Sequence, residues 1–145
     1  MNGRADGMAH VFPIRVYYED TDCGGIVYYA NYLKFAELAR TELLRVAGVN
    51  QMEMTERYGM GFAVRSCAID YRRPARLDDL VQVSSRLVKL TAATIEAAQD
   101  IRRGGDDLAH LDLRIVCVRR DGRPGRIPAP VRHALKPYLQ SREHC

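Results

Sequence analysis

Three carboxylates stand close together near the start of the chain, just before two glycines. Glu19, Asp20 and Asp22 fall within four residues, and Gly24 and Gly25 follow them. Like charges at this spacing repel one another, so a member of the group placed in a partly apolar pocket should have a raised pKa. Adjacent glycines let the backbone approach a ligand closely. The pattern indicates a site for acid, base or nucleophilic chemistry; the structural alternative is a solvated loop that complements a helix dipole.

A helix predicted from Asn31 onward supplies the other half of such a site. The first turn of a helix presents backbone N–H groups without intrahelical partners, and these can stabilise a developing oxyanion. A carboxylate with amide donors beside it is a minimal acyl-transfer site. The carboxylate either attacks the carbonyl carbon itself or activates a water molecule.

Other catalytic motifs are missing from the sequence. It has no GxSxG, GxxxxGK[ST], GxGxxG or HExxH pattern, so serine-hydrolase, P-loop, Rossmann and zincin chemistry have no support. The histidines are isolated from one another, which makes histidine a poor candidate for the general base; they are His10, His110, His133 and His144. The cysteines are equally scattered and form no CxxC pair; they are Cys23, Cys67, Cys117 and Cys145. Free thiols in a reducing cytoplasm are therefore expected, with no zinc site.

Hydrophobic periodicity predicts an α+β fold. Residues 12–18 alternate as a strand, and from Asn31, the expected N-cap, apolar residues recur every three or four positions until Gly48, the expected C′ residue. The apolar stripe of this helix is Tyr32, Phe35, Ala36, Ala39, Leu43 and Val46. Four more strand-like segments follow at 62–71, 81–87, 95–101 and 111–117. One long helix on a mostly antiparallel sheet of about five strands buries both apolar surfaces, and the other face or an edge of the sheet is expected to meet a second subunit.

Length and charge narrow the class of protein further. The 145 residues are 47% hydrophobic and 28% charged, which is typical of one globular domain with a sizeable core. No apolar run approaches the ~20 residues of a membrane span, and residues 1–12 contain no apolar block of a signal peptide, so a cytoplasmic protein is expected.

The net charge of +4 comes from the second half of the chain, where residues 73–145 hold 14 basic and 9 acidic residues. Of the 22 cations, 19 are arginines, and one group of them surrounds Asp121: Arg119, Arg120, Arg123, Arg126 and Arg132. Forked guanidinium donors suit phosphate, although a solvated turn and tail would also explain the group. Because no aromatic residues are interleaved with these arginines, a nucleic-acid partner is not expected.

One stretch of the sequence resembles a known family. Residues 17–40, with the pattern Y-Y-E-D-T-D-x-G-G-I-V-Y-x-x-N-Y followed by F-x-E-x-A-R, are similar to the hot-dog-fold acyl-CoA thioesterases of the Tol-Pal-associated (YbgC-like) branch. They also resemble the hydroxybenzoyl-CoA thioesterases of the same superfamily. The similarity continues through Tyr71-Arg72-Arg73-Pro74-Ala75 and Asp78-Asp79-Leu80, so that it covers roughly residues 11–135 of a single domain, 1–145.

The resemblance implies a fold, an activity and a set of site residues. It implies a hot-dog fold, in which the sheet wraps one long helix, and hydrolysis of an acyl-CoA without a cofactor. It places the catalytic carboxylate at Asp22, an oxyanion-binding backbone N–H at Tyr29, and an active-site side chain at Tyr18. Gly25, Ile26 and Val27 are expected to line the substrate. The Tol-Pal-type members often carry histidine at the position of Tyr29, whereas the hydroxybenzoyl type carries tyrosine, which leaves the acyl preference open.

Three other residues near Asp22 or on the helix could also take part in chemistry, but a different role is expected for each. Asp20 is expected to orient the loop, and Glu37 to face solvent or to pair with Arg40 or Thr41. Cys23 adjoins Asp22 but has no histidine nearby, so a thiol nucleophile is less well supported.

Two further functions are left open by the sequence. A hydratase or dehydratase of the same fold generally needs a histidine, and residues 15–45 contain none. A non-catalytic protein that binds envelope or lipid-synthesis proteins is suggested by the Tol-Pal association alone. A pocket long enough for CoA needs more elements than one chain supplies, so a homodimer or homotetramer with sites between chains is expected.

Overall fold

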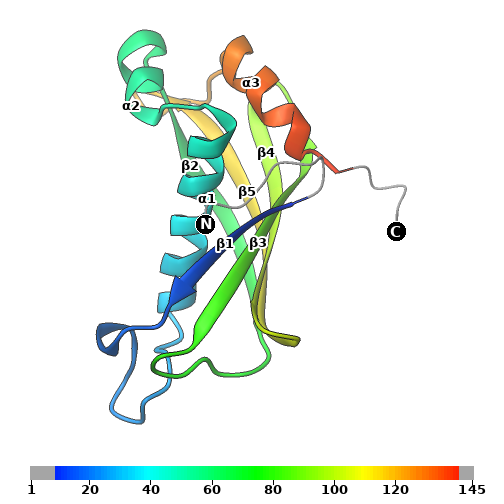
Figure 1. Ribbon diagram of the computed structural model, residues 1–145. Helices are drawn as coiled ribbons and strands as arrows, with labels where there is room; N and C mark the ends of the chain where they lie inside the picture. The colour runs from blue at the N-terminus through cyan, green and yellow to red at the C-terminus, as the bar shows by residue number, and fades with distance from the viewer. Residues whose placement is uncertain (1–8, 141–145) are drawn as a thin grey trace.

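A computed structural model describes residues 9–140 of the chain and shows one long helix lying across an antiparallel sheet (Figure 1). The sheet has five strands in the order β1-β3-β4-β5-β2, and every neighbouring pair is antiparallel. The strands are β1 (His10–Arg15), β2 (Met60–Tyr71), β3 (Leu80–Leu90), β4 (Thr94–Arg103) and β5 (Asp106–Arg119). The predicted α+β architecture is confirmed. Among the described residues, no helix combines the length and the hydropathy needed to cross a bilayer.

Helix α1 (Asn31–Ala47) packs its apolar stripe against the sheet. Its buried residues are Tyr32, Phe35, Ala36, Ala39 and Leu43, five of the six predicted positions, whereas Val46 is exposed. Gly48 ends the helix in the left-handed region at φ 91°, as expected of a C′ glycine. The N-cap prediction was wrong. Asn31 is the first helical residue, and its side-chain Nδ2 donates to the carbonyl of Asp20 at 2.9 Å.

Short helices close the end of the molecule away from the start of α1 (Figure 1). They are α2 (Gln51–Glu53), the π-helical turn η2 (Met54–Tyr58), α3 (Ala129–Leu135) and the 3₁₀ turn η3 (Lys136–Tyr138). Met54, Val131, Leu135 and Tyr138 from these segments are buried with Leu43 and the far ends of the strands. This apolar cluster fixes the C-terminal half of α1, while Tyr32, Phe35 and Ala36 of the first half pack in a separate cluster with β3 and β5 residues such as Val83 and Leu111.

The first strand is shorter than predicted. It ends at Arg15, and Tyr18, Glu19 and Asp20 form a 3₁₀ turn, η1 (Tyr18–Asp20), in place of further strand. The reason is the Asp20 carboxylate, which is buried and accepts the backbone N–H of Tyr17 at 2.9 Å. That bond draws the chain back on itself directly after Val16. The other four strands extend past the predicted bounds by one to five residues at one or both ends, because ladder pairing continues past the apolar run.

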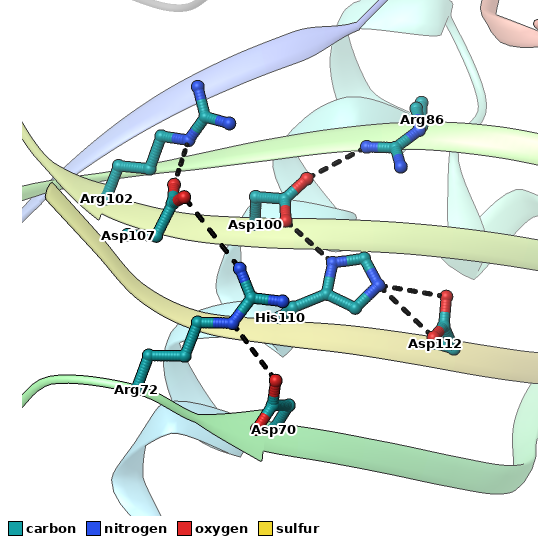
Figure 2. Close-up of polar contacts among 8 residues, drawn as sticks. All are labelled: Asp70, Arg72, Arg86, Asp100, Arg102, Asp107, His110 and Asp112. Atoms are coloured by element: carbon teal, nitrogen blue, oxygen red, sulfur yellow. Dashed lines mark hydrogen bonds and ion pairs between the residues drawn. The ribbon is translucent and has the colours of Figure 1, made fainter. Parts of the chain in front are cut away.

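The face of the sheet opposite α1 carries a network of charged side chains (Figure 2). His110 on β5 lies between two carboxylates, with Nδ1 2.6 Å from Asp100 Oδ1 and Nε2 3.2 Å from both oxygens of Asp112. Arg86 on β3 donates to the other oxygen of Asp100 at 2.9 Å. A second set links Arg102, Asp107, Arg72 and Asp70. This face is polar, and its charges neutralise one another.

Replacing His110 with glutamine should lower stability at neutral pH and have little effect at alkaline pH. The hydrogen bond to Asp100 raises the pKa of His110 above its ordinary 6.5. Because the folded-state pKa is the higher one, the extra stability is complete below 6.5 and is lost as the pH rises through the raised value. Burial works against ionisation of Asp100, but its bonds to His110 and Arg86 outweigh that effect and lower the pKa of Asp100.

Urea unfolding of the two proteins across this pH range tests the prediction. We expect a difference in unfolding free energy of about 1 kcal/mol on the acid side of neutrality, the size of one partly solvated hydrogen bond. The difference should shrink as the pH rises. A gap that is constant with pH would show that His110 acts through packing alone.

Candidate active site

The loop between β1 and α1 is organised by Asp20. Besides the N–H of Tyr17, its carboxylate accepts Lys34 Nζ of α1 at 2.8 Å, and its side chain is 6% exposed. Its backbone carbonyl accepts the N–H of Tyr28 at 3.1 Å and the side chain of Asn31. A single residue therefore ties the start of the loop to its end and to the helix. This is the orienting role expected for it.

Asp22 lies at the tip of this loop with its carboxylate exposed. Oδ1 accepts the backbone N–H of Gly24 at 2.8 Å, and a Cβ atom at Gly24 would lie 3.3 Å from that same oxygen. The backbone is closed by Asp22 N–H to the carbonyl of Ile26 (2.9 Å) and by Gly25 N–H to the carbonyl of Asp22 (3.0 Å). Gly25 has φ 78°, a conformation that other residues adopt at a cost. The glycine pair thus shapes a turn that presents the Asp22 carboxylate.

The other side of the loop is fastened to the segment between β2 and β3. Val27 is buried and donates its N–H to the carbonyl of Ala75 at 2.8 Å, and Leu77 donates to the carbonyl of Gly25 at 3.1 Å. Ile26 forms an isolated antiparallel bridge with Arg76. The substrate-lining residues predicted at 25–27 therefore form a short two-stranded edge below Asp22.

Tyr29 follows this edge, two residues before α1 begins, and 60% of its surface is exposed. Its carbonyl accepts the hydroxyl of Tyr71 at 3.0 Å, and its ring lies edge-on to the ring of Tyr71 with centroids 6.1 Å apart. In the described part of the chain, no hydrogen bond uses the backbone N–H of Tyr29. The structure thus holds Tyr29 by its carbonyl and leaves its amide donor free.

The remaining predicted residues are less closely tied to Asp22. Tyr18 is 81% exposed and has no ring contact among residues 9–140, although its carbonyl accepts both donors of Thr21. Glu37 is exposed on α1, and in the described chain it makes no ion pair with Arg40, in keeping with the solvent-facing alternative. Cys23 is an exposed free thiol next to Asp22.

The arginines are divided between the two ends of the molecule. Arg102 and Arg103 lie at the β4–β5 turn and are neutralised by Asp107 at 2.8 Å and by Asp79 at 2.7 Å. The 119–126 group follows β5 at the opposite end from the Asp22 loop, near α2 and α3 (Figure 1), where Arg120 donates to the carbonyl of Thr55.

Sequence reasoning missed Arg76. It is exposed, it bridges Ile26 through the backbone, and it makes no ion pair within the residues that the structure describes. A free guanidinium at this place is suited to a phosphate group. Its only signal in the sequence is its position directly after Pro74-Ala75, in the second block of the resemblance.

In the part of the chain that the structure describes, no three His, Cys, Asp or Glu side chains are grouped as metal ligands. The chemical groups at the loop include the exposed carboxylates of Asp22 and Glu19, the free amide donor of Tyr29 and the surrounding tyrosines.

Comparison with known proteins identifies the family. The model of the thioesterase-like superfamily matches residues 16–135. The acyl-CoA thioesterase YbgC of Haemophilus influenzae is 44% identical over 107 residues, which cover 74% of this chain and 79% of the relative. The acyl-CoA thioester hydrolase YbgC of Escherichia coli is 39% identical over 109 residues, covering 74% of this chain and 80% of the relative.

Solved structures agree with the sequence comparison. The crystal structure of a probable thioesterase from Bartonella henselae superposes with a TM-score of 0.79 at 35% identity, covering 83% of this chain and 99% of that one. The predicted hot-dog architecture and the resemblance that suggested it are both confirmed. With the matched region reaching from the end of β1 to the end of α3, the chain belongs to the thioesterase-like superfamily.

Proposed function

We propose that this protein hydrolyses the thioester of an acyl-CoA to the free acid and CoA, with Asp22 as the catalytic carboxylate and the Tyr29 N–H as oxyanion donor. The observation that carries the proposal is the exposed Asp22 carboxylate, held by Gly24 N–H, in the same short loop as the unused N–H of Tyr29. The relatives named acyl-CoA thioesterases support the substrate class.

The geometry suits two forms of the reaction. Gly24 N–H occupies Asp22 Oδ1, and among the described residues no hydrogen bond reaches Oδ2, which is left to react. Oδ2 either attacks the thioester carbonyl to form an anhydride that water then cleaves, or removes a proton from an attacking water. In both forms the carbonyl oxygen gains negative charge, and the Tyr29 N–H near the positive end of the α1 dipole stabilises it until the CoA thiolate leaves.

A screen of thiol release from short-chain, long-chain and aromatic acyl-CoAs tests the function. Release of CoA from at least one member at a rate that depends on Asp22 is the expected result. Complete inactivity across the panel, together with retention of an envelope or lipid-synthesis protein in a pull-down, would favour the non-catalytic alternative. His110 gives the hydratase alternative no support, because its ring lies between Asp100 and Asp112 on the face of the sheet opposite α1 (Figure 2).

The proposed enzyme is a homo-oligomer whose dimer forms along β2. This twelve-residue strand is an edge of the sheet, it pairs only with β5 among residues 9–140, and most of its residues are exposed. A long uncovered edge invites another strand, and a second copy in antiparallel orientation satisfies it with two-fold symmetry. The ion-paired outer face is the less suitable surface. Exposed Tyr71, the last residue of β2, lies on the same edge and would be covered as well.

Replacing Arg65 with proline should convert the dimer to a monomer. Arg65 is the extra residue of a bulge between Val64 and Ser66, where pairing with β5 is interrupted, so proline there leaves the β2–β5 ladder in place. On the free edge, proline removes a donor and blocks a second strand. Sedimentation velocity of this variant beside Arg65→Ala measures the effect. An unchanged oligomer in Arg65→Pro would place the interface elsewhere.

The remaining parts of the proposal concern context. We place the protein in the cytoplasm, as a single domain over residues 1–145 with its core at about 11–135, and acting without a cofactor. Pairing of dimers into tetramers and contact with envelope or lipid-synthesis proteins of the Tol-Pal setting belong to the same proposal. Fractionation of cells followed by detection of the native protein tests the location.

A further inference from the structure

A cavity of about 220 Å³ lies between the C-terminal half of α1 and the sheet. Its walls are largely apolar and come from the helix and from four strands, among them Leu43, Leu44, Phe62, Leu87, Ile95 and Ile115. Polar side chains line it as well: Glu37, Arg40, Thr41, Gln51, Ser85, Arg86 and Gln99. Three of these, Arg40, Gln99 and Ser85, are joined by hydrogen bonds and form one polar wall. The cavity does not include the Asp22 loop, and neither the loop's chemistry nor the apolar core accounts for its polar wall.

Gln99 fixes the guanidinium of Arg40 at this wall. Gln99 is fully buried on β4, and its Nε2 donates to the carbonyl of Ala36 at 3.0 Å and to Ser85 Oγ at 2.9 Å. With both amide hydrogens engaged, Oε1 is oriented as an acceptor, and it receives Arg40 Nη1 at 3.0 Å. The arginine is therefore held in one place by a buried residue that cannot easily turn.

The positive charge of Arg40 is not neutralised. Among residues 9–140 its bond to Gln99 is its one hydrogen bond, and no carboxylate oxygen lies within ion-pair distance. A guanidinium has five donors, so most of them are free. Burial lowers the pKa of Arg40, with the charge of Glu37 acting in the opposite direction. Arg40 is half-buried, and an anchored guanidinium with no ion-pair partner beside an apolar cavity leaves donors that an anion can complete.

We propose that this cavity receives the acyl chain of the substrate and that Arg40 binds a carboxylate at the far end of that chain. The inference rests on the proposed thioesterase function and deepens it by naming the substrate class, an ω-carboxyacyl thioester. Arg40 lies nine positions after Asn31, about 14 Å along the helix axis. An acyl chain of medium length laid along α1 therefore reaches from the start of the helix to Arg40. The apolar walls take the methylene groups, and the guanidinium takes the carboxylate through paired hydrogen bonds.

The test compares two acyl-CoAs of matched chain length, one ending in a methyl group and one in a carboxylate. For the wild type, kcat/KM should favour the carboxylate. In Arg40→Met the ratio of the two values should fall roughly tenfold to a hundredfold, the effect of losing a hydrogen bond to a charged group. Arg45→Met is the matched control, because Arg45 is an exposed arginine of the same helix paired with Glu42, and its ratio should not change.

Binding of the free dicarboxylate to the Asp22→Asn variant gives a readout that needs no turnover. Calorimetry should detect a complex that Arg40→Met abolishes. Two results overturn the inference: equal loss of both substrates in Arg40→Met, or a change of its oligomeric state, which would assign the guanidinium to a carboxylate of a second copy. If neither thioester is hydrolysed by the wild type but the dicarboxylate still binds through Arg40, the proposed function fails and the binding site stands.

Discussion

Asp22→Asn should lower kcat on every acyl-CoA by a factor on the order of a thousand or more, the usual cost of removing a catalytic base or nucleophile. Asparagine keeps an oxygen that can accept the Gly24 N–H, so the turn is preserved while the charge and the nucleophile are lost. Folding and oligomeric state should therefore match the wild type. Steady-state thiol release, with circular dichroism and sedimentation of the same samples, measures both parts.

Glu19→Gln is the matched control for this experiment. Glu19 is an exposed carboxylate in the same loop, and its contact is an ion pair with Lys34 at 3.7 Å. Removing its charge should change kcat by less than about a factor of two, because exposed ion pairs contribute little. Hydrolysis by Asp22→Asn at a rate near that of the wild type on any acyl-CoA would remove Asp22 from the mechanism.

Asp20→Ala should destabilise the protein and disable the site together. The change removes the acceptor of two hydrogen bonds in a nearly buried position, one from the N–H of Tyr17 and one from Lys34 Nζ. Lys34 can turn to solvent, so the main cost is the loss of charge-assisted bonds, about 2–3 kcal/mol. Activity should fall further than stability suggests, because the turn that presents Asp22 keeps its backbone bond to Asn31 but loses its link to Lys34 of α1.

Chemical denaturation and activity well below the melting temperature separate these two effects. Lys34→Met completes a double-mutant cycle with Asp20→Ala, and we expect the two changes to be less than additive, since the residues share a bond. If Asp20→Ala unfolds at the denaturant concentration of the wild type and keeps full activity, the loop is organised by its backbone bonds alone.

Hydrophobic periodicity predicted the helices and strands that have one face in the apolar core and the other in solvent. The stripe from Tyr32 to Leu43 and the alternation in β3 and β5 each reflect contact with the core, and both appear in the structure. The prediction that the first strand continues to Tyr18 was wrong. Tyr18 continues the alternation of β1 in the sequence, but the buried carboxylate of Asp20 turns the chain. Periodicity records burial, and it contains no information on a single polar side chain that redirects the backbone.

The site was predictable where its parts are neighbours in the sequence. Asp22, Gly24 and the start of α1 fall within ten residues, so spacing predicted a carboxylate beside helix amides, and the family resemblance then implied Asp22 as the catalytic one. Arg76 and the pair of Arg40 with Gln99 could not, because they are brought to their places by β3 and β4. The excess of arginine was visible in the composition. The composition could not predict that Arg102 and Arg103 form ion pairs with aspartates.

The hydrogen bonds between the Asp22 loop and residues 75–77 affect when the loop can form during biosynthesis. Its bonds to Ala75 and Leu77, together with the pairing of β1 with β3, join the start of the chain to a segment made much later. Such non-local contacts form late in folding because long chain loops must close first. On the ribosome, a nascent chain that already contains every residue of the Asp22 loop should leave the proposed site unformed until β3 has emerged, so any catalytic competence of this loop is acquired only when the sheet assembles.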